Sequence, residues 1–353
     1  MKKKTILITG GAGFIGINAA DYFLNKGARV ILFDNLSRNG TAYNLKWLKS
    51  KWGKKFKFIK GDIVTDLKKL DKAVAPADAV LHLAAQVAVT LSVQNPKKDF
   101  EINAMGTLHV LEAIRKSKKN PVVIYTSTNK VHGNLDHLPV VLTSIGHNYD
   151  GLPHGVSELC NLDFHSPYGC SKGAADQYVR DYARIFRIKS VVFRQSCIYG
   201  PHQFGMEDQG WVAWFVISAL IGRKINIYGD GHQVRDVLHV NDLCRLYDFT
   251  IENPDKIAGK IFNIGGGPSS AYSILNTIKK LEGILGDSIP FSFADWRPGD
   301  QKVYISDIRK AKAELGWEPI VSFDDGLKSL IKWVKENEKL FRRLFLSKPK
   351  SKK

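Results

Sequence analysis

The sequence predicts an α/β fold, a doubly wound parallel sheet with a smaller C-terminal lobe interleaved with its end. First, the run Thr5–Gly16 reads as a short apolar strand, a glycine turn and the start of a helix. Second, apolar strand-like segments alternate with helical patterns through the first half of the chain, which is typical of a parallel sheet. Third, a chain of 353 residues is long enough to bury a large core.

The glycine turn has the spacing of a dinucleotide fingerprint. Gly10, Gly13 and Gly16 would serve the tight turn, the approach of a pyrophosphate and the packing of helix on strand. The N–H groups of the first helical turn, at Phe14 and Ile15, would face the phosphates. An ordinary turn before a helix is the alternative, and the flanking strand and helix disfavour it. The sequence therefore predicts a Rossmann-type nucleotide site.

An acid follows the second strand, Arg29–Phe33, about twenty residues after the glycines. Asp34 would accept hydrogen bonds from the adenosine ribose and repel a 2′-phosphate, which favours NAD over NADP. Arg38, in the polar loop that follows, weakens this preference because it could meet a phosphate. Asp62 would hold the adenine amino group or cap a helix.

The later strands complete the expected cofactor site. Segments 56–59, 79–86, 122–125 and 190–194 read as strands, and small residues end the second of these. His82 inside it is interpreted as a core histidine. The expected cofactor contacts are Gly10, Gly13, Phe14, Ile15, Gly16, Asp34, Asn35, Ser37, Arg38, Asp62, Ile63, Leu83, Ala84, Gln86, Asn103, Tyr168 and Lys172.

Three regions are expected along the chain. Residues 1–190 would form the NAD-binding Rossmann domain and residues 191–345 the substrate-binding lobe, with a basic tail at 346–353. A polar loop at 132–166 is long enough to be functional. Helices are expected at 211–220, 273–282 and 325–340.

Composition excludes several classes of protein. The formal charge of +18 is spread along the chain rather than gathered with aromatic residues, so we expect no nucleic-acid partner. No apolar run has the length of a membrane span, and we expect a cytoplasmic protein with no membrane partner. The four cysteines have no paired spacing, which disfavours a disulfide framework and a metal site.

A tyrosine and a lysine four residues apart would share one face of a helix. A phenol is too weak an acid to exchange protons at neutral pH, but the Lys172 ammonium and a nicotinamide cation would lower the pKa of Tyr168. Thr128, at the end of another strand, would orient the reacting hydroxyl. Together with the fingerprint and Asp34, Thr128, Tyr168 and Lys172 predict a catalytic set.

These motifs resemble the extended short-chain dehydrogenase/reductase family, in its nucleotide-sugar epimerase and dehydratase branch. The resemblance covers nearly the whole chain and implies a tightly bound, recycled NAD and a homo-oligomer. It implies that Tyr168 takes a proton from a sugar hydroxyl while the same carbon is oxidised and then reduced from its other face. Segments 33–38, 99–103, 127–130, 162–178, 208–211 and 233–239 are most similar to enzymes of this branch that invert carbon 2 of a CDP-linked dideoxyhexose.

The resemblance also assigns a substrate site. Arg235 and Arg297 would grip a pyrophosphate, and Asp300 would take the nucleoside ribose. The expected substrate contacts are Thr128, Asn129, Gln209, Gln233, Arg235, Arg297 and Asp300. His132 stands where the family usually has tyrosine, and residues 134–157 match poorly, which leaves the sugar substituents open.

Three other functions share part of this pattern. A 4,6-dehydratase would need two acids after Thr128, where this chain has Asn129 and Lys130. A UDP-hexose 4-epimerase uses the same catalytic set and stays open. A non-catalytic NAD-binding or nucleic-acid-binding protein is disfavoured by the intact set of Thr128, Tyr168 and Lys172.

Overall fold

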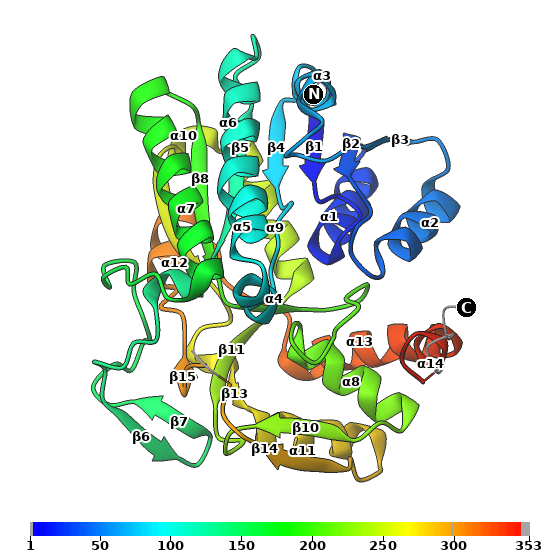
Figure 1. Ribbon diagram of the computed structural model, residues 1–353, viewed down its shortest axis with the longest axis vertical. Coiled ribbons are helices and arrows are strands. Elements are labelled where there is room, and N and C mark those ends of the chain that lie inside the picture. The colour runs from blue at the N-terminus through cyan, green and yellow to red at the C-terminus, as the bar shows by residue number, and fades with distance from the viewer. Residues whose placement is uncertain (1–2, 298–299, 347–353) are drawn as a thin grey trace.

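A parallel sheet forms the centre of the molecule (Figure 1). The structure is a computed structural model that describes residues 3–297 and 300–346. Within these residues seven parallel strands pair in one sheet. In spatial order they are β12 (Lys260–Ile264), β8 (Ser190–Gln195), β5 (Val122–Thr128), β4 (Ala79–His82), β1 (Thr5–Thr9), β2 (Arg29–Asp34) and β3 (Phe56–Lys60).

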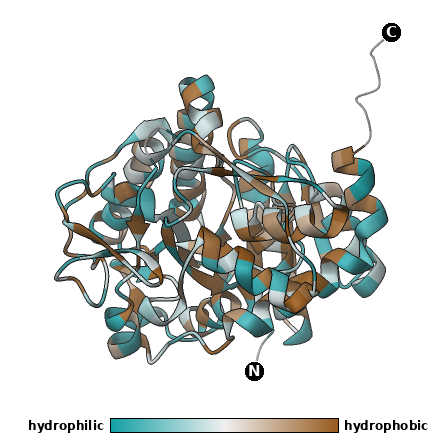
Figure 2. Ribbon diagram, turned by 90° about the horizontal axis from the view of Figure 1, so that it is seen from below, coloured by the Kyte–Doolittle hydropathy of each residue, from teal (hydrophilic) through white to brown (hydrophobic). Residues whose placement is uncertain are grey.

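Helices cover both faces of this sheet, as the alternation along β1 requires. Ile6 and Ile8 pack in the core that also holds residues of α1, α2 and α9. Leu7 packs in a second core on the opposite face, with residues of α3, α6 and α7. These helices are α1 (Phe14–Asn25), α2 (Thr41–Trp52), α9 (Val240–Glu252), α3 (Leu67–Val74), α6 (Gly106–Lys116) and α7 (Ser166–Phe186). Hydrophobic residues gather along the strands and the inner helix faces (Figure 2).

The strand order places a switch point beside the glycine turn. β1 pairs with β2 on one side and with β4 on the other, so the chain runs outward in both directions from this strand. Thr9 is in register with Phe33 and with His82. The carboxyl ends of the three strands therefore meet at one edge, where ligands bind in open α/β sheets.

The rest of the chain forms a second lobe beyond that edge. Its strands are β9 (Cys197–Tyr199), β10 (Ile225–Tyr228), β11 (Val234–His239), β13 (Ala271–Ser273), β14 (Phe291–Ala294) and β15 (Val303–Tyr304). Its main helices are α8 (Trp211–Ile221), α11 (Ile274–Leu285), α13 (Phe323–Glu336) and α14 (Glu338–Leu346). The short α10 (Pro254–Ile257) and α12 (Arg309–Leu315) lie near β12 and α9 (Figure 1). β8 begins at Ser190 and β12 lies later in the chain, yet both belong to the first sheet, so a boundary at residue 190 would divide that sheet.

Several elements differ from the sequence expectations. β4 ends at His82, four residues before the predicted end, because the chain leaves the sheet at the nucleotide edge. The long loop contains a hairpin, β6 (Val140–Thr143) and β7 (Gly146–Tyr149). The expected helix 325–340 is two helices that meet at Asn337. The predicted basic tail lies outside the described residues except for Leu346.

The segment before α6 is also irregular. After α4 (Val89–Gln94), α5 (Pro96–Phe100) continues into a π-helical turn, η1 (Glu101–Met105), and then into α6. Two short 3₁₀ turns occur elsewhere, η2 (Asn129–His132) and η3 (Pro268–Ser270). Single π turns inside helices are frequent at functional sites.

Candidate active site

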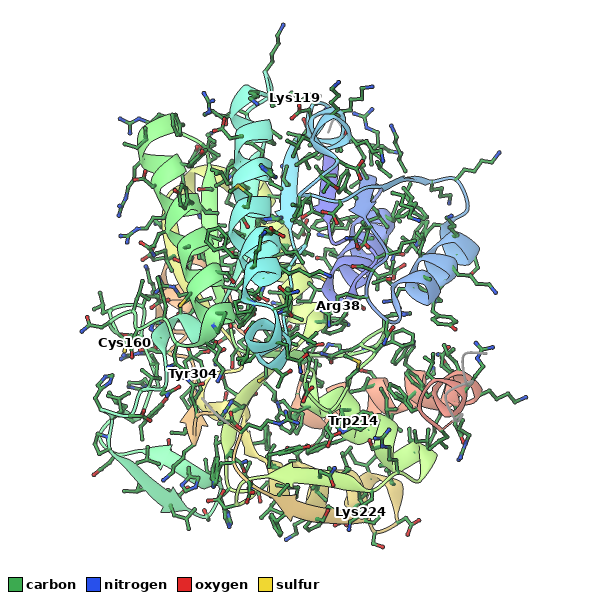
Figure 3. The ribbon with its side chains drawn as sticks, in the orientation of Figure 1. Arg38, Lys119, Cys160, Trp214, Lys224 and Tyr304 are labelled. Atoms are coloured by element: carbon green, nitrogen blue, oxygen red, sulfur yellow. The ribbon has the colours of Figure 1, made fainter. Side chains whose placement is uncertain are left out.

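A cavity lies where the carboxyl ends of the strands face the second lobe. Arg38 marks its position (Figure 3). It is lined by Gly10, Gly13, Phe14, Ile15, Gly16, Asp34, Asn35, Ser37, Arg38, Asp62, Ile63, Leu83, Ala84, Tyr168, Lys172 and Gln209, all expected at the site. One cavity therefore joins the glycine turn to the Tyr168 and Lys172 pair.

The glycine turn fits its predicted role in detail. Gly10 has a φ of +65°, and a Cβ there would lie 2.8 Å from the backbone nitrogen of Ala84. A Cβ on Gly16 would lie 2.4 Å from the carbonyl oxygen of Gly10. Only glycine allows both approaches. The start of α1 is thereby held against the turn, with its first N–H groups at the cavity wall.

Asp34 is placed for a ribose. Its carboxylate accepts hydrogen bonds from the backbone N–H of Ala12 at 3.0 Å and of Leu36 at 2.7 Å. Burial raises the pKa of this carboxyl, and the two backbone N–H groups and Arg38 oppose the rise. Each carboxylate oxygen keeps a further lone pair, because it accepts one of these bonds. We call the turn that contains Gly10, Gly13 and Gly16 the glycine cradle. The cradle and Asp34 together fit a dinucleotide whose ribose has a free 2′-hydroxyl.

Arg38 does not stand free at the ribose position. Its guanidinium donates to the Gln209 side chain at 3.0 Å, which links the first lobe to the second. Asn35 donates to Asp62 at 2.7 Å, so these two predicted adenosine contacts support each other. Asp62 also accepts from the Val64 backbone N–H at 2.8 Å.

Two predicted cofactor residues do not line the cavity. Asn103 is 1% exposed, and its amide donates to the Gln86 carbonyl and accepts from the Gln86 N–H. The Gln86 side chain donates to the Asp99 carboxylate at 2.8 Å. The half-buried Gln86 and the buried Asn103 thus form a network behind the cavity, because the Gln86 side chain turns to Asp99 while Ala85 and Val87 on either side line the cavity. Their role as direct contacts is not supported by this geometry.

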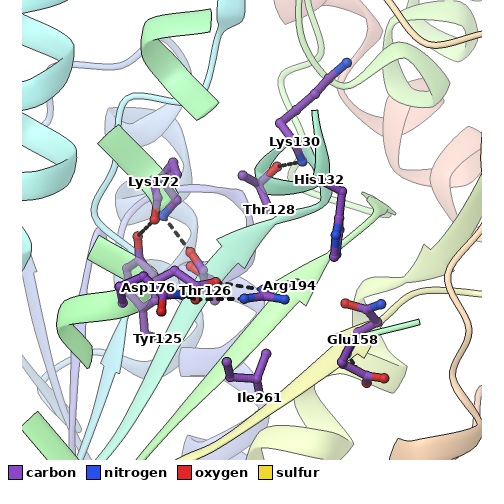
Figure 4. A network of polar contacts seen from close by, with 12 residues as sticks. Tyr125, Thr126, Thr128, Lys130, His132, Glu158, Lys172, Asp176, Arg194 and Ile261 are labelled. Carbon is purple, nitrogen blue, oxygen red and sulfur yellow. Dashed lines mark hydrogen bonds and ion pairs between the residues drawn. The ribbon is translucent and has the colours of Figure 1, made fainter. Parts of the chain in front are cut away.

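Thr128, Tyr168 and Lys172 are brought together at the end of β5 and the start of α7. A hydrogen bond joins the side chains of Thr128 and Tyr168. Lys172 Nζ donates to the carbonyl of Thr126 at 2.6 Å and lies 4.3 Å from the centre of the Tyr125 ring (Figure 4). The catalytic set expected from the sequence is thus assembled from two elements.

The protein surroundings of Tyr168 raise the pKa of its phenol rather than lower it. Burial raises the pKa of Tyr168 to about 12, against the opposing effects of the Thr128 hydrogen bond and the Arg38 charge. Burial also lowers the pKa of Lys172 to about 7, opposed by Asp176 and Asp99. Desolvation disfavours both charged forms, and the lowering of the Tyr168 pKa by Lys172 and a nicotinamide cation stays a prediction.

The other predicted substrate residues lie in the second lobe or beside η2 and do not line the cavity. Arg235 donates to Asp300 at 2.6 Å, so the pyrophosphate and ribose ligands expected from the sequence pair with each other. Arg297 donates to the Glu207 carbonyl at 3.1 Å and lies 3.9 Å from the Tyr228 ring centre. Gln233 is buried, donates to the Tyr228 carbonyl and leaves its own carbonyl oxygen unpaired.

Thr128, Asn129 and Lys130 connect the two groups of residues. The Thr128 hydroxyl accepts from the Lys130 backbone N–H at 3.2 Å and donates to the Asn129 side chain at 3.3 Å. The Lys130 charge interacts with Arg235 and Asp300, and burial lowers the pKa of Lys130 to about 8. The end of β5 therefore faces the charged cluster of the second lobe.

Some lining residues were missed by the sequence analysis. They are Phe33, Asn39, Thr41, Asn44, Gly61, Ala85, Val87, Ile102, Thr126, Ser127, Gln195, His202, Gln203 and Phe204. Gln195 follows a predicted strand, so the rule that located Asp34 could have found it. His202, Gln203 and Phe204 lie in a loop for which the sequence offers no periodic signal. His82 is a core histidine, with ring nitrogens 2.7 Å from the Thr9 hydroxyl and 2.9 Å from that of Thr107.

Other site types find no support in the described part of the chain. Residues 3–297 and 300–346 contain no cluster of three metal-binding side chains and no helix long and apolar enough to span a membrane. The cysteines at 160, 170, 197 and 244 are free thiols. His132, at the predicted family departure, is buried with its ring stacked 6.4 Å from that of Tyr304.

The family described as GDP-mannose 4,6-dehydratase matches residues 7–330. The chain belongs to this family of extended short-chain dehydrogenases/reductases. The relatives of this chain are named for different reactions, among them 2-epimerisation, 4-epimerisation and 4,6-dehydration. The chain is 46% identical over 336 residues to the CDP-paratose 2-epimerase of Salmonella typhi. The aligned region covers 93% of this chain and 98% of that protein.

More distant family members share the same architecture. The chain is 32% identical to a putative UDP-glucose 4-epimerase of Methanocaldococcus jannaschii over 95% of this chain and 99% of that protein. The UDP-glucuronic acid 4-epimerase of Bacillus cereus, solved with UDP-glucuronic acid and NAD, superposes with a TM-score of 0.81 at 30% identity. That match covers 94% of this chain and 99% of the other.

Proposed function

We propose that this protein is an NAD-dependent epimerase that inverts carbon 2 of a nucleotide-bound dideoxyhexose and converts CDP-paratose to CDP-tyvelose. The observation that carries the proposal is that one cavity joins Tyr168 and Lys172 to the dinucleotide cradle, with Thr128 hydrogen-bonded to Tyr168. The 46% identity to a CDP-paratose 2-epimerase supports this substrate over those of the relatives that are 32% identical or less.

Three side chains would handle the proton. Tyr168, as a phenolate, accepts the proton of the sugar 2-hydroxyl, and Thr128 holds that hydroxyl in line through its own hydrogen bond. The Lys172 ammonium stabilises the phenolate electrostatically. In the second half of the cycle Tyr168 returns the proton to the oxygen at carbon 2.

The cradle would keep the cofactor in place between the two half-reactions. Gly10, Gly13 and Gly16 admit the pyrophosphate, and Asp34 accepts the ribose hydroxyls. The chemistry that NAD supplies when bound is the uptake and return of a hydride at the sugar carbon. Because the cycle leaves NAD unchanged, no external redox partner is required.

The second lobe would hold the nucleotide. Arg235 and Arg297 would bind the pyrophosphate after the substrate replaced their carboxylate partners, Asp300 and Asp208, which lie at 2.6 Å and 3.1 Å. Gln209 would approach the sugar, because it lines the cavity. We infer further that the protein works in the cytoplasm as a homo-oligomer, without a nucleic-acid or membrane partner.

A substrate panel tests the proposal. Purified protein is incubated separately with CDP-paratose, UDP-glucose and UDP-galactose, and the sugar configuration is read by NMR. Appearance of CDP-tyvelose from CDP-paratose is the expected result. Interconversion of the two UDP-hexoses alone would instead support a UDP-hexose 4-epimerase. Turnover of none of the three, with NAD bound, would contradict the proposed substrate.

A further inference from the structure

A buried carboxylate that has no role in the proposed reaction lies behind α7, the helix that carries Tyr168 and Lys172. Asp99, on α5, is 1% exposed. Its Oδ2 accepts a hydrogen bond from the Ser171 hydroxyl at 2.5 Å, and its Oδ1 accepts from Gln86 at 2.8 Å and from Asn103 at 3.2 Å. Ser171 is the residue before Lys172 in the chain. Asp99 is therefore attached to the catalytic helix at its catalytic turn.

The hydrogen-bonding partners of Asp99 are neutral. Ser171, Gln86 and Asn103 provide hydrogen bonds but no positive charge, and in residues 3–297 and 300–346 no ion pair includes Asp99. The other buried carboxylate near Lys172 is different. Asp176 accepts from the Arg194 guanidinium at 2.9 Å and 3.1 Å, so its charge has a partner of its own.

Several titratable groups face Lys172. Tyr168 and Asp176 lie on its own helix, His82 and Tyr125 on the strands beneath it, and Asp99 on α5. His82 is held neutral by burial, which lowers its pKa to about 3. Tyr125 presents the face of its ring to the ammonium. Asp99 is the carboxylate in this group without an arginine or lysine bonded to it.

We propose that Asp99 is a positioning residue of the active site, whose carboxylate, tied to the helix by Ser171, serves as the counter-charge that keeps Lys172 an ammonium. The network also fixes the helix turn, because Ser171 lies 3.2 Å from the Tyr168 carbonyl and the Tyr168 N–H donates to Ser92 at 3.1 Å. The π turn η1 supplies Asn103, which donates to both Ser171 and Asp99.

Burial raises the pKa of Asp99, and the hydrogen bonds from Ser171, Gln86 and Asn103 and the charge of Lys172 oppose the rise. Burial lowers the pKa of Lys172 to about 7, and the charges of Asp176 and Asp99 raise it. Asp176 has the larger effect of the two, but it is shared with Arg194. Since the two carboxylates oppose the effect of burial, loss of either one would favour the neutral form of Lys172.

The test measures the charge of Lys172 directly. Full-length protein is prepared with ¹³C-labelled lysine, and the Lys172 signal is assigned by its loss in Lys172→Met. We expect Asp99→Asn, which keeps the size of the side chain, to move the titration midpoint of Lys172 downward by about 1 pH unit. A midpoint unchanged in folded Asp99→Asn would overturn the proposal.

A matched control separates charge from folding. Asp242 is also fully buried, on α9, and pairs with Arg245 at 2.5 Å. Asp242→Asn should leave the Lys172 midpoint unchanged, whatever it does to the melting temperature. If Asp99→Asn fails to fold, Ser171→Ala gives a second test. It removes the hydrogen bond from Ser171 to Asp99, and it should lower the Lys172 midpoint by a smaller amount. No movement in Ser171→Ala would then overturn the proposal.

An activity measurement adds a second readout, which rests on the proposed function. In Asp99→Asn the alkaline limb of the kcat profile should move to lower pH, and Asp99→Glu should move it back toward the wild type. A loss of kcat at all pH values with no movement of the limb would indicate a structural role alone. The NMR titration needs no substrate, so failure of the proposed reaction would leave that test intact.

Discussion

At the scale of single residues, burial in the candidate active site opposes the charged forms of its side chains. Tyr168 is 8% exposed and Lys172 is 3% exposed, so both charged forms are disfavoured before any ligand binds. Burial raises the pKa of Tyr168 to about 12 and lowers that of Lys172 to about 7, so it opposes the phenolate and the ammonium alike. A cationic nicotinamide beside Tyr168 would offset part of this effect, because its charge would stabilise the phenolate.

Removing the phenol should therefore abolish proton transfer while leaving the cradle intact. In Tyr168→Phe we expect kcat to fall about 10²–10⁴-fold. The glycine turn and Asp34 are untouched, so bound NAD, measured by its release on acid denaturation, should stay at the wild-type level. Wild-type turnover in this variant would remove Tyr168 from the proton-transfer role.

The arginines of the second lobe should act on binding rather than on chemistry. Arg235 is held by Asp300 at 2.6 Å and lies outside the cavity that contains Tyr168. We expect Arg235→Gln to raise KM for the nucleotide sugar about 10-fold or more with a smaller change in kcat, because a charge-assisted contact to phosphate is lost. Arg115→Gln, which breaks a surface pair with Glu112, is the control and should change neither value.

At the scale of elements, the contact between α1 and the glycine turn decides whether the cradle forms. A Cβ on Gly16 would lie 2.4 Å from the Gly10 carbonyl oxygen and 2.8 Å from the Gly11 Cα, which are backbone atoms that cannot rotate away. Gly16→Ala should push the first turn of α1 off β1. We expect loss of bound NAD and a lower melting temperature, measured by absorbance and calorimetry.

Replacement of a second glycine by alanine is expected to stabilise the protein instead. Gly283 lies inside α11, has no positive φ, and a Cβ there would meet nothing within 4 Å. Gly283→Ala should stabilise the protein by about 0.5–1 kcal/mol, since alanine favours the helix. Equal effects of the two substitutions would contradict the steric argument for Gly16.

Elements with a strong local pattern were predictable, and those set by tertiary contacts were not. Apolar periodicity, the glycine turn before α1 and the Pro–Tyr pair at the start of α7 are visible in the sequence. These features predict β1, β2, α1 and α7. The π turn η1 depends on packing that brings Asn103 to Ser171, which are 68 residues apart. The same holds for Gln86, whose small-residue neighbours suggested a cofactor contact although its side chain binds Asp99.

At the scale of the whole molecule, the site is built where the two lobes meet. The first lobe supplies the cradle, Tyr168 and Lys172, and the second supplies Gln209, which is bound to Arg38 across the cavity. Thr90 donates to Asp208 at 3.3 Å, a second link between the lobes in the same segment. Residues 208 and 209 therefore couple the position of the second lobe to the NAD-binding loop.

Acid should weaken the whole fold through its buried histidines. Burial lowers the pKa of His82 to about 3 and those of His132, His202 and His239 to about 4. Their pKa values in the unfolded chain are near 6.5, so between pH 6.5 and 4 the unfolded state binds more protons than the folded state. Stability should therefore fall as pH falls through this window, by up to about 1.4 kcal/mol per pH unit for each histidine.

Urea unfolding at pH 7.0, 6.0 and 5.5 measures this dependence in a range where few carboxylates titrate. His202 is suited to the comparison, because its ring packs 3.9 Å from that of Trp47 and 5.3 Å from that of Trp333. His202→Phe retains a ring but cannot bind a proton, so its unfolding free energy should fall less steeply with acid than that of the wild type. Parallel slopes for the two proteins would mean that His202 binds protons equally in the folded and unfolded states, against the effect of its burial.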